Sequence, residues 1–238
     1  MAIKMTVNGV EAEVKQGSLA SLFTPPKPKK RLVNEWGDAP TEVDTTEPLY
    51  PNSKEVNITI GVDSKLVGSL WTSLLSKEVA EVQFLGRTIP LRVTTATREE
   101  FSDTLTEMCL SGVIDTPKVV LSKAPTTLSE ALLEGSQLSG STVVIKPGAS
   151  EQVTGMAGGL YVTNGMVVQG RSSRSLKLLI RAKGAELWGA YDRIASVLFA
   201  PKTIVDGVAM EYQSGGTSAL ELYGDTFYWE VDLNFLTL

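Results

Sequence analysis

The stretch Phe227-Tyr-Trp-Glu-Val-Asp-Leu-Asn-Phe235 decides the fold. Every second residue in it is apolar, and Tyr228, Glu230, Asp232 and Asn234 fill the positions between. A period of two is that of a β-strand with one buried face and one face in water. We therefore expect an antiparallel sheet that packs its apolar face against other elements and leaves its polar face open.

The residues that precede this strand predict the elements that pack with it. Apolar residues alternate from Leu176 to Ala182 and again from Val208 to Tyr212, which indicates two further strands. From Arg174 onward we expect the order strand, helix, strand, strand. The helix is predicted by five residues that recur at the spacing of one helix face, namely Leu187, Tyr191, Ile194, Ala195 and Leu198.

The block from Val56 to Thr95 predicts the same order of elements. The two blocks share no sequence identity, so we attribute this echo to chance. The expected elements are a strand over 56–62, a helix over 66–75 capped by Asp63 or Ser64, and a hairpin of 79–85 with 88–95 across Gly86-Arg87.

A capping box follows at Thr97-Arg-Glu-Glu100, in which Thr97 caps a helix N-terminus and Glu100 reaches back to it. The helix that it predicts ends at Ser111-Gly112. Cys109 lies on its apolar face, so we expect a buried, unreactive thiol, and a lone cysteine can form no intrachain disulfide. The apolar face of this predicted helix consists of Phe101, Leu105, Met108 and Cys109.

Residues 118 to 169 predict only short elements. The segment Gly155-Met-Ala-Gly-Gly159 lacks both the Gly-Lys-Ser/Thr ending of a phosphate loop and a helix after it, so we assign it no phosphate site. The expected elements are strands at 118–121 and 142–146, one or two helical turns within 126–133, and a hairpin of 160–163 with 166–169 across Asn164-Gly165.

Residues 1–53 differ from the rest because they hold six of the 11 prolines. Proline lacks an N–H group and fixes φ, so the stretch cannot form a regular helix or a central strand. A small hairpin from Ile3 to Val14 is expected around Asn8-Gly9. Trp36, Leu49 and Tyr50 are isolated apolar anchors that favour an arm lying on a neighbouring subunit, and a floppy terminus is the alternative.

These elements together predict an α+β fold. We expect a mainly antiparallel sheet packed by two or three helices, with an extended N-terminal arm. The arm covers residues 1–53 and the α+β domain covers 54–238, with a possible division into 54–96 and 97–238.

The composition narrows the possible functions. The 238 residues include no histidine and one cysteine, so the commonest general base, the Ser-His and Cys-His pairs and histidine-containing zinc sites are all missing. We therefore expect no catalytic residue, no metal and no cofactor. The 22 Lys and Arg against 27 Asp and Glu give a net charge of −5, which opposes free binding to nucleic acid.

The sequence predicts neither a membrane span nor a signal region. No apolar run approaches the roughly 20 residues that a span needs, and the first residues lead into a polar segment. We expect a protein that is made and kept in a cytoplasm unless a particle carries it elsewhere.

Acidic residues offer the one enzymatic alternative. Asp225, Glu230 and Asp232 crowd together, with Glu211 and Glu221 on the preceding hairpin. Paired carboxylates can act as acid and base or hold a metal ion, so the alternative is a metal-dependent hydrolase. Glu230 and Asp232 also occupy polar positions of the alternating strand, where a solvated face predicts them.

Two basic groups could contact an acidic partner. Lys177 and Arg181 share one face of their strand and are candidates for contact with a neighbouring subunit or a polyanion. The simpler explanation is a solvated spacer for the group from Lys27 to Arg31 and an exposed strand face for the group from Arg171 to Lys183. For each group, the contact and the simpler explanation both stay open. The groups are Lys27, Lys29, Lys30 and Arg31, and Arg171, Arg174, Lys177, Arg181 and Lys183.

Three segments together resemble the tail-terminator and tail-completion proteins of tailed bacteriophages. They are Leu176-Lys-Leu-Leu-Ile-Arg-Ala182, Glu186-Leu-Trp-Gly-Ala-Tyr-Asp-Arg-Ile-Ala195 and the strand Phe227–Phe235. In that family a strand leads to a helix with an acidic and aromatic face, and a long strand closes the sheet. The resemblance covers residues 97–238. Residues 1–96 depart from it, so another neck or connector protein and a baseplate component remain alternatives.

The resemblance implies a structural subunit and not an enzyme. Such a subunit forms a ring, often hexameric, that caps the tail tube and joins it to the head connector, with DNA only as passing cargo. Its partners are copies of itself and other tail or neck proteins, and its location is the virion after assembly in the host cytoplasm. The candidates for contacts between subunits are Trp36, Leu49, Tyr50, Lys177 and Arg181.

Overall fold

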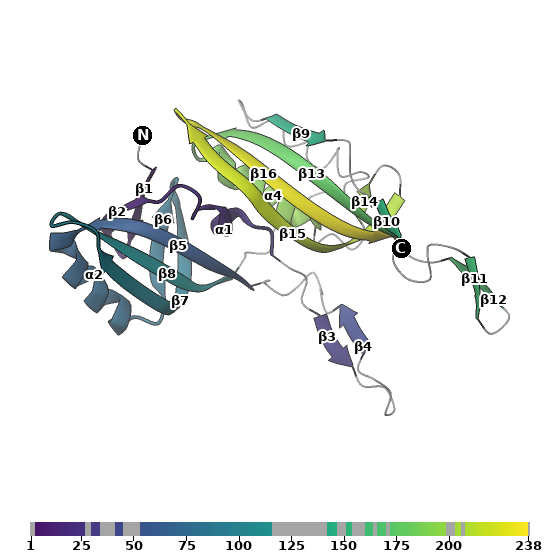
Figure 1. The fold of residues 1–238 in the computed structure, drawn as a ribbon, viewed down its shortest axis with the longest axis horizontal. Helices are drawn as coiled ribbons and strands as arrows, with labels where there is room; N and C mark the ends of the chain where they lie inside the picture. Colours follow the sequence, from purple (N-terminus) through teal and green to yellow (C-terminus); the bar gives the residue numbers. More distant parts are fainter. Residues whose placement is uncertain are drawn as a thin grey trace.

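Two antiparallel sheets, lying side by side, make up most of the structure (Figure 1). One is a closed barrel built from the first half of the chain, and the other is an open sheet built from the second half. The computed structural model describes residues 3–26, 30–33, 41–44, 53–115, 142–146, 151–153, 160–163, 166–169, 172–198, 203–205 and 208–237.

The open sheet is organised around the strand that the alternating stretch predicts. This strand, β16, lies between β13 and β15 and pairs with both along most of its length. Its apolar side chains from Phe227 to Phe235 are buried at every second position, and the polar residues between them are half-buried or exposed. The helix α4 lies against this sheet (Figure 1), where Tyr191 contacts Trp229. The elements are β9 (Thr142–Lys146), β10 (Glu151–Val153), β13 (Ser172–Lys183), α4 (Glu186–Leu198), β14 (Thr203–Val205), β15 (Val208–Tyr223) and β16 (Thr226–Thr237).

The barrel has the strand order β1-β2-β5-β8-β7-β6 and closes where β1 pairs with β6. This closing contact is short, since only Thr6 and Val7 pair with Gln83 and Val82. The helix α2 follows β5 and packs against β5 and β8. The elements are β1 (Ile3–Val7), β2 (Val10–Val14), β5 (Ser53–Asp63), α2 (Ser64–Ser76), β6 (Ala80–Phe84), β7 (Arg87–Glu100) and β8 (Leu105–Asp115).

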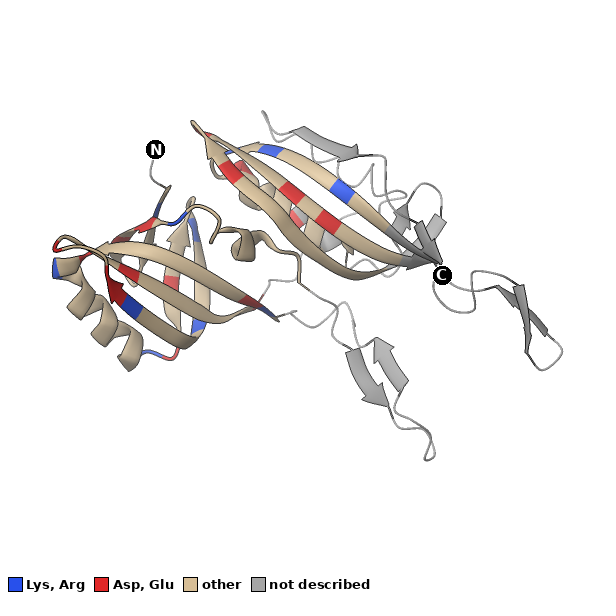
Figure 2. Cartoon of the chain, in the orientation of Figure 1, with Lys and Arg blue, Asp and Glu red and all other residues tan. Residues whose placement is uncertain are grey.

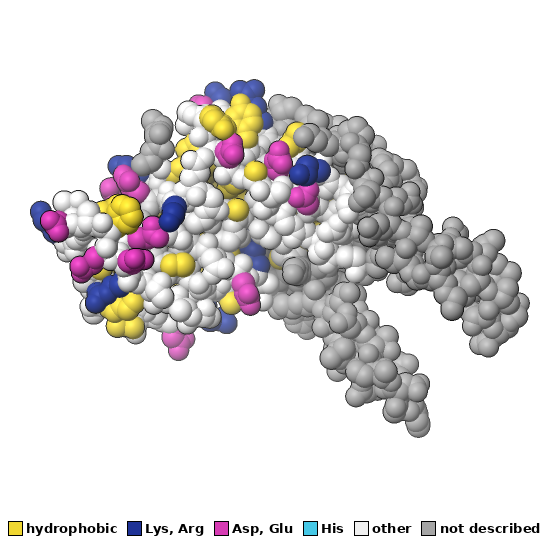
Figure 3. All heavy atoms as spheres, viewed as in Figure 1, with side chains coloured by type: hydrophobic (Ala, Val, Ile, Leu, Met, Phe, Trp, Pro, Cys, Tyr) yellow, Lys and Arg dark blue, Asp and Glu magenta, His cyan; other side chains and the backbone are white. Residues whose placement is uncertain are grey.

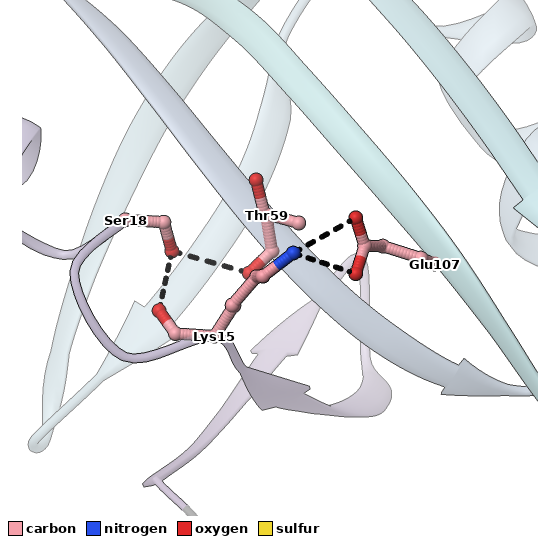
Figure 4. Close-up of polar contacts among 4 residues, drawn as sticks. All are labelled: Lys15, Ser18, Thr59 and Glu107. Atoms are coloured by element: carbon pink, nitrogen blue, oxygen red, sulfur yellow. Dashed lines mark hydrogen bonds and ion pairs between the residues drawn. The ribbon is translucent and has the colours of Figure 1, made fainter. Parts of the chain in front are cut away.

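Serine side chains cover the part of the β5 edge that β2 leaves unpaired, since β2 pairs there only through Glu13 and Val14. The Ser21 hydroxyl, in the short helix α1 (Ala20–Phe23), donates to the Asn57 carbonyl at 2.7 Å and accepts from the Asn57 N–H at 3.1 Å. Beyond it, the carbonyl of Thr59 accepts from the Lys15 N–H at 2.9 Å and from the Ser18 hydroxyl at 3.2 Å (Figure 4). These hydroxyls supply hydrogen bonds that a neighbouring strand would otherwise make.

An aromatic cluster joins the barrel to the open sheet. Phe23 of α1 lies at its centre, with ring centroids 4.5 Å from Trp188 and 5.8 Å from Trp229. Trp188 also donates its indole N–H to the carbonyl of Phe84 at 2.9 Å, which links α4 to the barrel strand β6. Because these rings are buried and belong to both sheets, the two sheets share one hydrophobic core.

Two small hairpins pair only with themselves in the described part of the chain. One joins β3 (Lys30–Val33) to β4 (Thr41–Asp44), and the other joins β11 (Leu160–Thr163) to β12 (Met166–Gln169). An isolated two-stranded hairpin is marginally stable in water, so such elements gain stability when a further strand or surface packs on them.

The expected fold class is wrong. An α+β fold with two or three helices packed on the sheet was predicted, and the chain is instead mainly β with a closed six-stranded barrel. The extended N-terminal arm is wrong for residues 3–26, because the hairpin of Ile3–Val7 with Val10–Val14 supplies two barrel strands. Leu22 and Phe23 are also buried in the core. Prolines begin only at Pro25, so the composition of 1–53 concealed an ordered first half.

The helix predicted from the capping box at Thr97–Glu100 is also wrong, because these residues end β7 and the next strand is β8. Thr106, Met108 and Leu110 are buried at every second position of β8, which pairs along its whole length with β5. Pairing with a distant strand therefore outweighs the local capping signal. Cys109 points to the outer side of β8 and is half-exposed, so the prediction of a buried thiol fails as well.

Most other predicted elements are confirmed. Asp63 caps α2 by accepting from the N–H of Lys65 at 2.9 Å. The β6–β7 hairpin turns at Leu85 and Gly86, both with positive φ, one position before the predicted Gly86-Arg87. The segments 118–121 and 126–133 lie outside the described residues. The confirmed elements are β1–β2, β5, α2, β6–β7, β9, β11–β12, β13, α4, β15 and β16.

Candidate assembly surface

The predicted acidic set lies on the outward face of the open sheet, and lysines pair with it. Lys177 on β13 lies 3.4 Å from Glu230 and 3.5 Å from Asp232, and Lys183 lies 3.5 Å from Asp225. The charge of Asp232 raises the pKa of Lys177, with a hydrogen bond to Glu230 acting in the same direction. Carboxylates that are shared with lysines on an open strand face are poorly placed to hold a metal ion. Among the described residues, no cluster of three or more potential metal ligands occurs.

The predicted basic group meets these carboxylates on the same face, as the neighbouring blue and red positions of β13 and β16 indicate (Figure 2). Two of its members, Lys177 and Lys183, pair with the acids, while Arg181 is exposed opposite Tyr228. Among the described side chains, positive and negative groups therefore balance on this face, without the excess of positive charge that binding to a polyanion requires.

Several predicted sites cannot be compared with the structure. The contact candidates Trp36, Leu49 and Tyr50 lie outside the described residues, as do the glycines of 155–159. The side chains of Lys30, Arg31 and Arg174 also lie outside the described set. The contact roles of Lys177 and Arg181 remain predictions. The structure shows that Lys177 forms ion pairs with Glu230 and Asp232 of its own chain.

A different surface, at the end of the barrel, has two features that are typical of protein-contact sites. The first is the edge of β7. Strand β6 pairs with β7 only as far as Leu91, and β8 occupies the other side of β7 from Leu91 to Glu100. From Arg92 to Glu100 one edge of β7 therefore faces no strand in the described part of the chain. An open edge presents unpaired N–H and C=O groups and is a template for strand addition.

The second feature is the outer face of α2, which is almost free of charge. Val67, Leu70 and Leu74 pack into the core, and Lys65 is the only charged residue in the helix. Leu75 is 75% exposed and Leu66 is 43% exposed, and they flank the outer face on opposite sides, because nine positions turn a helix by about 180°. The helix is tan along nearly all its length in Figure 2, where charged residues are coloured. A solvated helix face normally carries several charges, so this face is unusual for a surface in water.

Further exposed apolar side chains lie at the two ends of α2. Phe101, at the β7–β8 turn, is 75% exposed, and Val79, between α2 and β6, is 39% exposed. Four of the six large apolar side chains that are exposed in the described residues therefore belong to this region, and apolar groups are visible there among the charged ones (Figure 3). These side chains surround α2 on different sides, and of the four only Phe101 lines a cleft between α2 and the β7–β8 turn.

A polar cleft of about 540 Å³ lies between the first turns of α2 and the β7–β8 turn. Ser64 and Thr106 line it and their hydroxyls lie 3.2 Å apart, while Arg98 lies with its guanidinium 5.0 Å from the ring centre of Trp71. Arg98 thus connects β7 to α2, so the open edge and the uncharged helix face form one continuous surface. We call the β7 edge from Arg92 to Glu100, the outer face of α2, Val79 and Phe101 the barrel-end surface.

The sequence contained a signal for this surface that was not used. Leu66, Val67, Leu70, Trp71, Leu74 and Leu75 were all assigned to one apolar helix stripe. Such a stripe is wider than one buried face needs, and the structure leaves its two outermost leucines exposed. The excess width of the stripe, together with the absence of charge after Lys65, indicates a helix with a second apolar contact.

Comparison of the chain with protein-family models, with curated proteins and with solved structures finds no match. In the described ranges, no helix is both long enough and apolar enough to cross a membrane.

Proposed function

We propose that this protein is a structural subunit that assembles with copies of itself into a ring of a bacteriophage tail or neck. The ring would cap the tail tube and join it to the head connector. The observation that carries the assembly role is the barrel-end surface, in which the described residues leave one edge of β7 without a strand next to a helix that has one charged residue and exposed apolar side chains around it. Strand edges and apolar patches of this kind bind protein partners.

The tail or neck assignment is supported by the element order of the second half. Strand β13, helix α4 and the closing pair of strands β15 and β16 come in the order that the phage tail-terminator resemblance uses, with the three-residue strand β14 between α4 and β15. This support is narrower than the sequence suggested, because the helix expected at Thr97–Glu100 is a strand. The net charge of −5 suits a channel through which DNA passes without binding.

Two alternatives use the same observations differently. A baseplate or another tail component would also assemble through the barrel-end surface. A metal-dependent hydrolase would use Asp225, Glu230 and Asp232, but their pairing with Lys177 and Lys183 favours a structural role for these acids. If the hydrolase were correct, Mg²⁺ or Mn²⁺ would raise the melting temperature, because an ion that binds only the folded state stabilises it.

The test of the proposed function is the state of the purified protein. Size-exclusion chromatography with multi-angle scattering should give one defined oligomer, and negative-stain images should contain rings. Addition of phage tail tubes should place these rings at tube ends. A protein that stays monomeric at high concentration, both alone and with tubes, would contradict the proposal.

A further inference from the structure

The hairpin β11–β12 and the barrel-end surface both have strand edges that are available for pairing. The hairpin pairs with no other strand in the described part of its own chain, and the β7 edge from Arg92 to Glu100 likewise faces no strand. Each therefore has main-chain hydrogen-bonding groups that a strand from outside could satisfy.

We propose that β11–β12 of one copy adds to the open edge of β7 in the next copy and covers the outer face of its α2. This inference rests on the proposed self-assembly and names the surfaces that carry it. Strand addition supplies main-chain hydrogen bonds between the copies. Burial of Leu75, which lies one helix turn after Trp71 on the flank of α2 that Arg98 of β7 contacts, supplies hydrophobic stabilisation.

Composition selects this hairpin over the other isolated hairpin. None of the eight strand residues of β11–β12 is charged, and six of them are apolar. Four of the eight strand residues of β3–β4 are charged, namely Lys30, Arg31, Glu42 and Asp44. An uncharged hairpin matches the outer face of α2, where a charged one would lose hydration without gaining a partner.

The length of the edge also fits. The uncharged part of the open edge is Val93-Thr-Thr-Ala-Thr97, bounded by Arg92 on one side and by Arg98 on the other. Each strand of the hairpin has four residues, so either one is short enough for this stretch. The register of β7 shifts between Val93 and Thr95, so regular pairing with an added strand is centred on Thr95 to Thr97. The threonines and the alanine of the edge place no bulky or charged group in the way.

The two surfaces belong to different parts of the chain, so the contact between copies is heterologous. Each copy offers one hairpin and one edge, and copies therefore join head to tail. A head-to-tail contact gives a ring when the rotation closes and a filament when it does not. A ring is the outcome that the proposed function requires.

Lysine substitutions on the two surfaces test the contact. Thr95→Lys adds a charge to the open edge, and Val167→Lys adds one to the hairpin. Thr88→Lys is the matched control on β7, because Thr88 is exposed but lies where β6 already pairs. Val43→Lys is the control in the other hairpin. We expect Thr95→Lys and Val167→Lys to weaken association about tenfold or more, and the two controls to assemble like the unchanged protein.

Cross-linking in a mixture tests whether the contact is between chains. Thr97→Cys and Val167→Cys are made in separate chains, each with Cys109→Ser, and are mixed with a short bismaleimide. A cross-linked pair that contains one chain of each kind is expected. A mixture that yields no such pair would overturn the proposal, as would a cross-link that forms only within a chain that carries both cysteines.

The outcomes separate this inference from the proposed function. If the unchanged protein forms no oligomer alone or with tail tubes, the proposed function fails and the inference falls with it. If rings form and Thr95→Lys and Val167→Lys form them equally well, only the inference fails. Melting curves check that each variant is folded, and Thr97→Lys replaces Thr95→Lys if the latter unfolds.

Discussion

The outward face of the open sheet and the barrel-end surface are both exposed, but they differ in how their side chains are partnered. On the open sheet, Lys177 and Lys183 pair with carboxylates, and Asn234 links Ser175 to Ser214 through hydrogen bonds of 2.6 and 3.2 Å. On the barrel-end surface, Leu75 and Phe101 lie in water with nothing over them in the described structure. Among the described residues, the polar side chains of the first surface are therefore paired with one another, whereas the exposed apolar side chains of the second are not covered.

Two strand edges of the barrel also differ in whether other groups of the chain cover them. The edge of β5 is covered within the chain by Ser18 and Ser21, whose hydroxyls bond to the carbonyls of Thr59 and Asn57. The edge of β7 beyond Leu91 has no such cover among the described residues. Within the described residues, the barrel thus covers one of these edges with side chains and not the other.

Phe23→Ala should have the largest effect, because it tests whether the two regions form one folded unit. The ring contacts Phe84 on the barrel strand β6, Trp188 and Tyr191 on α4, and Trp229 on β16 of the open sheet. Its loss should reduce the free energy of unfolding by about 3–5 kcal/mol. Urea unfolding followed by tryptophan fluorescence and by circular dichroism should give coincident curves in the unchanged protein. Two separate transitions there would mean that the regions fold independently.

Gly112→Ala should come next, because it disturbs β7 where its open edge begins. A Cβ atom at Gly112 would lie 2.4 Å from the carbonyl oxygen of Arg92 and 2.8 Å from a side-chain carbon of Leu91. The backbone must move, at a cost of about 1–3 kcal/mol. Gly216→Ala in β15 is the control, since a Cβ there meets nothing within 4 Å. Equal melting temperatures for the two variants would refute the close packing of β7 on β8.

Lys54→Met should change the pH dependence of stability at the junction between the regions. The Lys54 ammonium group donates to the carbonyls of Leu22 and Thr24 and lies 4.4 Å from the ring centre of Tyr191. Burial, and to a lesser degree the charge of Arg87, lowers the pKa of Lys54 well below its usual range. Between the lowered pKa and the ordinary one, the unfolded chain binds more protons, so stability rises with pH across that interval.

The variant should lose this rise, which amounts to at most about 1.4 kcal/mol per pH unit for a single proton. Urea unfolding from neutral to alkaline pH measures it. Lys77→Met, which removes an exposed lysine, is the control and should keep the slope of the unchanged protein. The same slope in Lys54→Met would mean that Lys54 does not titrate differently in the folded chain.

Ser21→Ala sharpens the comparison of the two barrel edges. It removes the hydroxyl that bonds both the N–H and the carbonyl of Asn57, so part of the β5 edge becomes as open as that of β7. The expected loss is about 1 kcal/mol, because Asn57 is exposed and water replaces part of what is lost. Hydrogen exchange should speed up at the Asn57 amide. Unchanged exchange there would indicate that the serine does not protect the edge.

Lys177→Ala should have the smallest effect, since it breaks exposed ion pairs on the outward face of the open sheet. Pairs with Glu230 and Asp232 in high dielectric contribute little to stability, and salt screens them. The melting temperature should fall slightly at low salt and not at all at 1 M NaCl. A large, salt-independent fall would mean that this face is held more tightly than its exposure suggests.

The sequence predicts those parts of the fold that depend on neighbouring residues. The alternation of β5, β13 and β16 and the cap of α2 at Asp63 are local patterns, and the structure contains them. Barrel closure is not local, because it depends on pairing Thr6 with Gln83 and Ser53 with Asp115. The residues 97–109 fit both a helix and a strand, since Leu105 and Met108 share a helix face while Met108 and Leu110 share a strand face.

The candidate site was predicted less well than the fold. Lys177 was identified from its place on a strand face, but its two acidic partners come from pairing with β16. The barrel-end surface was missed because an apolar residue in a helix is normally assigned to the core, as Leu66 and Leu75 were. Only the packing of α2 on the barrel distinguishes the leucines that are buried in the core from those that stay exposed.

The short pairing of β1 with β6, which closes the barrel, has a consequence for folding during synthesis. The side chain of Asn8 accepts from the N–H of Glu81, 73 positions later, and Lys15 pairs with Glu107, 92 positions later. A ribosome must therefore deliver about a hundred further residues before the first hairpin can find its permanent neighbours. At usual speeds of synthesis this takes several seconds. During this time, unpaired strands of adjacent nascent chains can associate with one another.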